Sequence, residues 1–157
     1  MKIQLVAVGK TSSGYIREGI DMYLNRLKHY LPVEVKIISD IKGNKSMTEE
    51  RQKELEGEAI LSTLMPGDYV VLLDERGDEL TSRQFSTYMD KRMSTVARRM
   101  VCIVGGPYGF SQKVYDRADS KLSLSRMTFN HEMVRLFFVE QLYRAMTILR
   151  GEPYHHD

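Results

Sequence analysis

A glycine-rich segment late in the chain is the first place where residue types and spacing suggest chemistry. It covers residues 105–110, with the sequence GGPYGF, and separates an apolar stretch ending at Val104 from Ser111, a residue type that begins helices. Glycines at such a turn let the backbone approach a ligand closely and leave amide groups free to bind it. The spacing G-G-x-x-G differs from the G-x-G-x-x-G fingerprint of dinucleotide sites. The segment is therefore either a ligand-binding turn or a plain turn between a strand and a helix.

Two other segments have features of ligand-binding loops. Residues 122–129, with the sequence LSLSRMTF, run from a strand end into a loop, where small hydroxyls and free backbone groups can hold an adenine or a carboxylate. The alternative is a strand followed by a helix cap. Residues 9–11, with the sequence GKT, match the end of a phosphate-binding P-loop, but Gln4 occupies the position where that motif needs its first glycine. We therefore interpret Gly9 as the end of a strand.

The C-terminal tail, residues 151–157, has the sequence GEPYHHD. Chain ends usually fray, but Pro153 stiffens this one, and Tyr154 and His155 are unusual choices for a frayed end. Histidine titrates near neutral pH, which suits proton transfer. A metal site is not predicted, because the other histidines are scattered and the single cysteine, Cys102, lies in an apolar stretch.

Strands and helices alternate along the chain, and these elements must position the three segments. Apolar runs predict strands at residues 3–8, 33–39, 69–74, 100–104 and 121–124. Helical spacing and capping residues predict helices from about Ile16 to a stop at Pro32, at 48–64, at 81–93, after Ser111 and at 131–150, with a loop at 40–47. This alternation predicts an α/β fold with a mostly parallel sheet and helices on both faces. Ligands bind beyond the carboxyl ends of such strands, so the loops after Asp74, Val104 and Leu124 are the candidate sites.

Composition limits the class of protein. The chain has 157 residues, 42% of them hydrophobic, and we expect one domain, 1–157, with a substantial core. The net charge of +2 is far from the strongly basic balance of proteins that bind nucleic acid by charge alone. We expect neither a membrane span nor a signal peptide, and the single cysteine predicts an intracellular, reducing location.

Basic residues crowd two stretches of the chain, which by itself indicates solvated helix faces. These residues are Lys91, Arg92, Arg98 and Arg99 in one stretch and Arg135, Arg144 and Arg150 in the other.

Taken together, the segments resemble the RlmH family of SPOUT-class methyltransferases. The similar stretches are residues 1–10 (MKIQLVAVGK), 103–109 (IVGGPYG), 122–129 (LSLSRMTF), 133–135 (MVR), 140–145 (EQLYRA) and 150–155 (RGEPYH). The resemblance extends over the whole chain without large gaps. It implies methylation of N3 of a pseudouridine in 23S ribosomal RNA, with S-adenosylmethionine as cofactor, on assembled ribosomes in the cytoplasm. It also implies a C-terminal trefoil knot and a homodimer with its sites near the subunit interface, without metal or membrane.

The resemblance also assigns site residues. It implies that the cofactor contacts Leu73, Gly105, Leu124, Ser125, Arg126, Met127, Thr128 and Phe129. On the nucleotide side it implies Arg144 as a ligand of phosphate or a base edge and Tyr154 as a residue that stacks on or hydrogen-bonds the target base. His155 is then either a general base or a positioning group.

The residues themselves leave two other hypotheses open. One is a nucleotide-binding α/β enzyme of another class, which uses residues 105–109 for phosphate. The other is a non-catalytic RNA-binding module.

Overall fold

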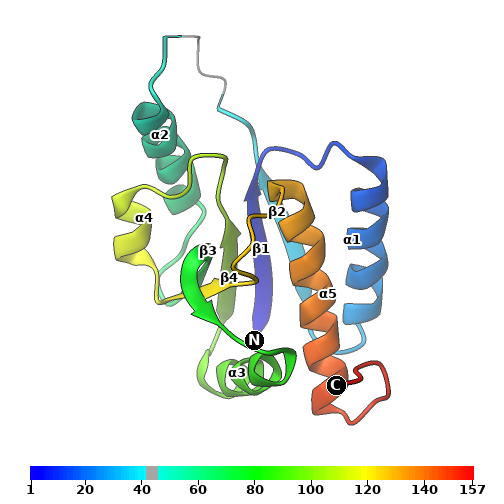
Figure 1. Ribbon diagram of the computed structural model, residues 1–157. Coiled ribbons are helices and arrows are strands. Elements are labelled where there is room, and N and C mark those ends of the chain that lie inside the picture. The colour runs from blue at the N-terminus through cyan, green and yellow to red at the C-terminus, as the bar shows by residue number, and fades with distance from the viewer. Residues whose placement is uncertain (42–45) are drawn as a thin grey trace.

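The computed structural model describes residues 1–41 and 46–157 and contains a five-stranded sheet (Figure 1). The strands are β1 (Lys2–Val8), β2 (Val33–Ile38), β3 (Tyr69–Glu79), β4 (Arg99–Val104) and β5 (Ser120–Ser123). Their order is β2-β1-β4-β3-β5 and each neighbouring pair is parallel, which confirms the predicted sheet. Part of the loop predicted at residues 40–47 lies outside the described residues. The trefoil knot stays a prediction.

Helices cover both faces of the sheet, as predicted (Figure 1). α1 (Gly14–Leu27), α3 (Ser82–Thr95) and α5 (His131–Leu149) pack on one face, and α2 (Glu49–Ser62) and α4 (Gln112–Arg117) pack on the other. Successive residues of β4 point to opposite faces, so Cys102 belongs to the first core and Ile103 to the second. Burial raises the pKa of the Cys102 thiol to about 12, and the residue serves as a small hydrophobe.

The predicted helix starts are present, with one difference. Thr81 and Gln84 form the expected capping box of α3, with reciprocal bonds of 3.1 and 2.9 Å. Ser111 occupies the cap position of α4, but its hydroxyl makes no hydrogen bond to the first turn. Its Oγ lies against α2 instead, only 2.3 Å from where a Cβ on Gly57 would stand. Close packing of α2 against the start of α4 therefore determines where the Ser111 side chain lies.

Strand β3 continues to Glu79, beyond the end at Asp74 that its apolar run predicts. The continuation is irregular, because Leu73 and Asp78 both pair with Leu122 of β5. Residues 74–77 therefore bulge out of the strand at its carboxyl end. A Cβ on Gly77 would stand 2.6 Å from the backbone of Leu122, so the bulge packs too tightly for a side chain there.

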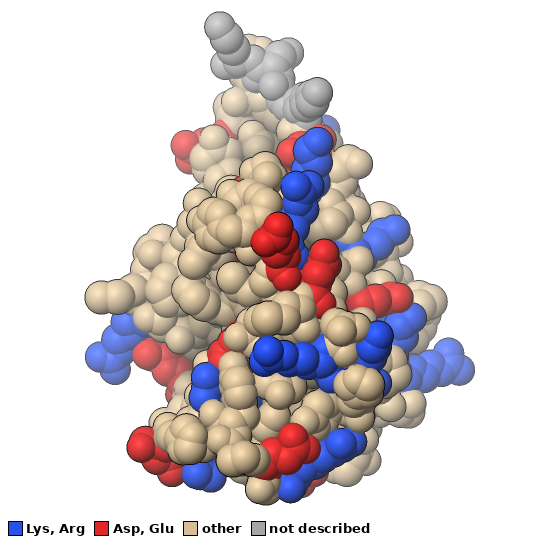
Figure 2. Space-filling view, turned by 90° about the vertical axis from the view of Figure 1, so that its right-hand side faces the viewer, with Lys and Arg blue, Asp and Glu red and all other residues tan. Residues whose placement is uncertain are grey.

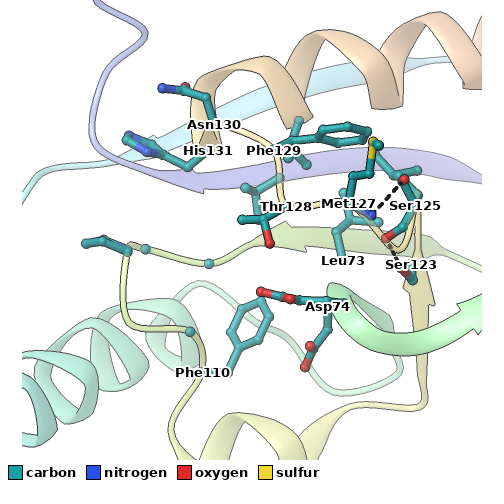
Figure 3. Close-up of a pocket in the computed structure, with 18 of the residues that line it drawn as sticks. Leu73, Asp74, Phe110, Ser123, Ser125, Met127, Thr128, Phe129, Asn130 and His131 are labelled. Atoms are coloured by element: carbon teal, nitrogen blue, oxygen red, sulfur yellow. Dashed lines mark hydrogen bonds between the residues drawn. The ribbon is translucent and has the colours of Figure 1, made fainter.

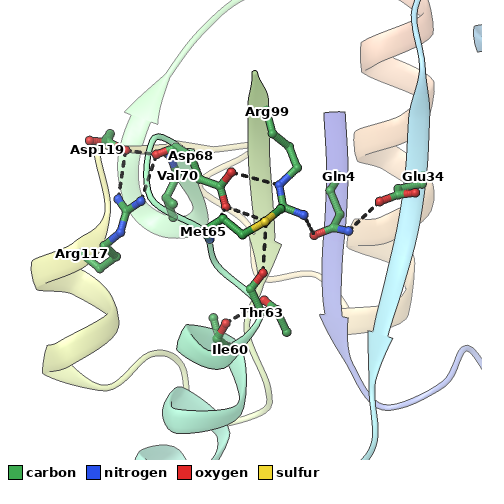
Figure 4. Close-up of polar contacts among 10 residues, drawn as sticks. All are labelled: Gln4, Glu34, Ile60, Thr63, Met65, Asp68, Val70, Arg99, Arg117 and Asp119. Carbon is green, nitrogen blue, oxygen red and sulfur yellow. Dashed lines mark hydrogen bonds and ion pairs between the residues drawn. The ribbon is translucent and has the colours of Figure 1, made fainter. Parts of the chain in front are cut away.

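A buried polar network holds the opposite, amino end of the sheet (Figure 4). Arg99 donates to both carboxylate oxygens of Asp68, at 3.0 and 2.6 Å, and also to Gln4 Oε1 and the Thr63 carbonyl, both at 3.1 Å. Burial raises the pKa of Asp68, but the hydrogen bonds from Arg99 and from the Met65 amide outweigh it and hold that pKa below its usual value. We interpret this network as stabilising the fold, because it lies at the opposite end of the sheet from the candidate loops.

Several of the clustered basic residues have structural partners, so their interpretation as solvated helix faces is wrong in part. The Arg92 guanidinium stacks 4.7 Å from the centre of the Tyr69 ring, Arg99 belongs to the network above, and Arg135 is buried. On the face in Figure 2, basic and acidic side chains are interspersed rather than gathered by sign. Among the described residues, no helix is long and apolar enough to cross a membrane.

Candidate functional site

A pocket of about 320 Å³ opens at the carboxyl ends of β3, β4 and β5 (Figure 3). The three loops that the sequence predicts as candidate sites meet here. The pocket is lined by Leu73, Asp74, Glu75, Val104, Gly105, Gly106, Pro107, Gly109, Phe110, Tyr115, Ser123, Leu124, Ser125, Met127, Thr128, Phe129, Asn130, His131 and Val134.

The glycine-rich loop needs its first two glycines for packing. A Cβ on Gly105 would stand 3.2 Å from the buried ring of Phe110, and one on Gly106 would stand 2.2 Å from Glu56 Oε2. A side chain on Gly106 would therefore point toward α2, where Glu56 is 3% exposed and burial raises the pKa of its carboxyl. Substitution of Gly106 threatens the fold, whereas substitution of Gly105 mainly disturbs the pocket wall.

Side chains of the loop between β5 and α5 use several of their polar groups to shape the loop itself. Ser123 Oγ donates to the Ser125 carbonyl at 2.8 Å, and Ser125 Oγ accepts from the Met127 amide at 3.0 Å. Asn130 Oδ1 accepts from the Glu132 amide at 2.8 Å and caps α5. These hydrogen bonds restrain the loop before any ligand binds, which lowers the entropic cost of binding.

Seven of the eight predicted cofactor residues line the pocket. Arg126 is the exception, because its side chain is 88% exposed and donates to Glu79 at 2.9 Å. Sequence reasoning placed Phe110 in the glycine-rich segment but assigned no role to Asp74, and it missed Tyr115. Asp74 directly follows the apolar run of β3, which is a usable signal, whereas Tyr115 reaches the pocket only through the packing of α4.

The pocket is acidic. Asp74 and Glu75 contribute carboxylates, and no lysine or arginine is among its described lining residues. Carboxylates repel phosphate and attract cations, so these two side chains favour a cationic ligand. In the part of the chain that the structure describes, no group of three or more His, Cys, Asp or Glu side chains is placed to hold a metal ion.

Two charged residues of α5 tie the pocket wall to the loop after β1. Glu132 accepts from the amides of Ser12 and Ser13, at 2.7 and 3.2 Å. Arg135 is 1% exposed and donates to the carbonyls of Gly9 and Val8, at 2.7 and 2.9 Å. Because backbone carbonyls at the end of β1 accept hydrogen bonds from the buried Arg135 guanidinium, the start of α5 is fixed relative to the sheet.

The tail is packed against α5, where it brings the three predicted nucleotide-side residues together. The Arg144 guanidinium lies 4.7 Å from the centre of the Tyr154 ring. Glu140 Oε1 accepts from Arg144 Nη2 at 2.6 Å and from the Tyr154 hydroxyl at 3.1 Å. Burial, a hydrogen bond with Tyr23 and the Glu140 carboxylate all raise the pKa of Tyr154, so its phenol stays protonated.

His155 completes this tail cluster, which we define as Glu140, Arg144, Tyr154 and His155. Its Nδ1 lies 3.1 Å from Arg144 Nη1, and its Nε2 lies 2.8 Å from Asp157 Oδ1. Arginine can only donate, so Nδ1 accepts and Nε2 carries the hydrogen that it donates to Asp157. The lone pair that a general base needs is thus occupied by Arg144.

The pocket and the tail cluster are far apart within one chain. Arg144 follows His131 by thirteen residues on α5, about 20 Å along the helix axis. A second, mostly apolar groove of about 280 Å³ lies between them. It is lined by Leu80, Phe85, Leu122, Leu124, Phe129, Phe137 and Phe138, with Asp78, Ser82, Ser123, Glu140 and Gln141 at polar positions.

Comparison with known proteins matches this chain over its whole length. The family described as "Predicted SPOUT methyltransferase" matches residues 1–155. The chain is 60% identical over 157 residues to the ribosomal RNA large subunit methyltransferase H of Parabacteroides distasonis and 53% identical over 157 residues to that of Bacteroides fragilis, covering 100% of both chains in each case. It is 55% identical over 156 residues to that of Christiangramia forsetii, covering 99% of both chains. These matches confirm the resemblance seen in the sequence, and the chain belongs to the SPOUT methyltransferase family.

Proposed function

We propose that this protein is a single-domain enzyme that transfers a methyl group from S-adenosylmethionine to RNA of the large ribosomal subunit. The target that we propose is N3 of a pseudouridine in 23S ribosomal RNA, methylated on assembled ribosomes in the cytoplasm. Family membership and the names of the relatives support the reaction class. They argue against both other hypotheses, the nucleotide-binding enzyme of another class and the non-catalytic RNA-binding module.

The negative charge of the pocket is the main observation that supports S-adenosylmethionine as the cofactor. S-adenosylmethionine has a cationic sulfonium and a cationic ammonium beside one carboxylate, so its net charge is positive. Asp74 and Glu75 attract such a ligand, and they repel the phosphates that the nucleotide-binding hypothesis requires. Leu73, Leu124 and Phe129 supply apolar surface for an adenine, and backbone groups of the glycine-rich loop supply polar contacts.

When bound, the cofactor supplies an activated methyl group, and the chain must align the target nitrogen with it and manage the proton of that nitrogen. Tyr154 keeps its proton and donates it to Glu140, so toward the base its ring offers a stacking surface and its hydroxyl oxygen a hydrogen-bond acceptor. Arg144 offers a cation that Glu140 holds in place, suited to a phosphate or a base edge. His155 orients Arg144 through its Nδ1.

Arg144 lies about 20 Å from His131 along the axis of α5, so the tail cluster is not adjacent to the pocket of its own chain. We therefore include a homodimer in the proposal. A two-fold axis across the middle of α5 exchanges the two ends of that helix, so the tail of each copy approaches the pocket of the other. The apolar groove between pocket and tail cluster supports this arrangement, since Phe137 is 36% exposed there.

The direct test is mass spectrometry of 23S ribosomal RNA nucleosides from cells that lack this protein. We expect one methylated pseudouridine to disappear and to return when the gene is restored. Calorimetry of the purified protein with S-adenosylmethionine tests the cofactor separately. An unchanged nucleoside profile would contradict the substrate, and absence of cofactor binding would contradict the reaction.

A further inference from the structure

The bulge in β3 places one acidic side chain in the pocket wall. Regular pairing of β3 with β5 stops at Leu73 and resumes at Asp78, and Asp74 is the first residue of the intervening bulge. In Figure 3, Asp74 lies near Phe110 and across the pocket from Thr128. Bulges next to functional sites commonly redirect a side chain that a regular strand would point elsewhere.

Both carboxylate oxygens of Asp74 are held by the protein. Oδ1 accepts from the Arg76 amide within the bulge at 3.0 Å, and Oδ2 accepts from the Tyr115 hydroxyl of α4. Burial and the hydrogen bond to Asp74 raise the pKa of Tyr115 to about 12, so this phenol remains a donor at neutral pH. Close packing of Gly77 on Leu122 fixes the other end of the bulge.

Asp74 is therefore oriented in advance and half-buried, whereas the neighbouring Glu75 is exposed. Of the two pocket carboxylates, Asp74 is less screened by water and interacts more strongly with a bound charge. No arginine or lysine side chain among the described residues forms an ion pair with it; its side-chain partner is the neutral Tyr115. The Asp74 carboxylate is therefore held in place by neutral groups, and a bound ligand can supply the cationic partner.

We propose that Asp74, positioned by Tyr115, is the counter-charge for the cationic methionine part of the cofactor. This inference rests on the proposed function. It adds a charged side chain to the predicted contacts that line the pocket, which are otherwise glycine, apolar residues and the hydroxyl residues Ser125 and Thr128. If Asp74 interacts with the sulfonium, it also favours release of the product, because the sulfur becomes neutral once the methyl group has left.

Three adenosine ligands of different charge test the proposal by calorimetry on the full-length protein. S-adenosylmethionine has a sulfonium and an ammonium, S-adenosylhomocysteine has only the ammonium, and methylthioadenosine has neither. Asp74→Asn keeps the shape and removes the charge. We expect the substitution to lower the affinity for S-adenosylmethionine about tenfold, which is the effect of losing one charge-assisted contact. The affinity for methylthioadenosine should stay within about twofold of the wild-type value. S-adenosylhomocysteine then identifies the group: unchanged binding points to the sulfonium and weakened binding to the ammonium.

Tyr115→Phe tests the positioning role. It should lower the affinity for S-adenosylmethionine in the wild-type background. It should have no further effect in the Asp74→Asn variant, because Tyr115 acts through Asp74. Asp90→Asn on α3 is the matched control for loss of one negative charge at an exposed site, and it should bind all three ligands normally. Unchanged S-adenosylmethionine affinity in Asp74→Asn, or an equal loss for methylthioadenosine, would overturn the inference while leaving the proposed function standing. A wild-type protein that binds none of the three ligands would overturn both.

Discussion

Replacement of His155 by alanine separates the two roles that this residue can have in methylation. In the structure Nδ1 accepts from Arg144 and Nε2 donates to Asp157, so neither nitrogen is free to accept a proton from the target base. We therefore predict that His155→Ala weakens RNA binding and largely keeps the rate at saturation. A general base would give the opposite pattern, with a rate loss on the order of a hundred-fold.

The contacts of His155 set the size of the effect. The side chain is 12% exposed, and a hydrogen bond to a charged group contributes about 1.5–3 kcal/mol. The lower end applies, because Glu140 still holds Arg144 through two bonds, of 3.1 and 2.6 Å. Asp157 is 64% exposed and still bound by Arg83, so its loss of a partner adds little. The expected result is a rise in KM of about tenfold.

The assay is transfer of labelled methyl from S-adenosylmethionine to ribosomes purified from cells that lack the protein, over a range of ribosome concentrations. His29→Ala is the control, since His29 is exposed at the end of α1, outside the pocket and the tail cluster. A mutant with normal KM and a hundred-fold lower kcat would refute the positioning role and show that the Arg144 contact breaks during the reaction.

The other predictions concern the pocket, the dimer, the tail and the sheet. Gly105→Val should abolish S-adenosylmethionine binding by calorimetry while circular dichroism stays native, because the new side chain stands against Phe110 at the pocket wall; a folded variant with normal affinity contradicts this placement. Phe137→Asp should yield a monomer by light scattering without turnover, and an active monomer would refute the shared site. Deletion from Tyr154 onward should keep cofactor binding and sharply reduce turnover on ribosomes, and normal turnover would remove Tyr154 and His155 from the site. Asp68→Asn should cost about 3 kcal/mol in urea unfolding at pH 7, because it leaves the Arg99 charge unpaired. Since the folded-state pKa of Asp68 lies below its ordinary value of 3.8, the difference between wild type and mutant should persist above that value and shrink as pH falls through the lower folded-state pKa; a difference that is independent of pH would rule out this linkage.

Local patterns in the sequence were sufficient for the architecture. Apolar runs and helix starts depend on neighbouring residues, so the alternation of strands and helices, the parallel sheet and the capping box at Thr81 all followed from spacing. The general rule that ligands bind at the carboxyl ends of parallel strands then located the pocket at three loops, and seven of eight predicted cofactor residues line it.

Only the tertiary structure shows the features that depend on contacts between residues distant in sequence. The bulge that places Asp74 exists because Leu73 and Asp78 both pair with Leu122, and the sequence of β3 alone does not show that pairing. Arg92, Arg99 and Arg135 have the appearance of surface charges in the sequence, yet each is held by an aromatic ring, a carboxylate or backbone carbonyls from another element.

The separation of pocket and tail cluster is also a tertiary result. Motifs near the end of the chain are close in sequence, but an α-helix rises about 1.5 Å per residue, so α5 keeps its two ends apart. The sequence, through its resemblance to the family, predicted which residues contact the cofactor and which contact the nucleotide. Only the tertiary structure decided that the pocket lies at the amino end of α5 and the tail cluster near its carboxyl end, because the pocket is built from loops of β3, β4 and β5 that are distant from the tail in sequence.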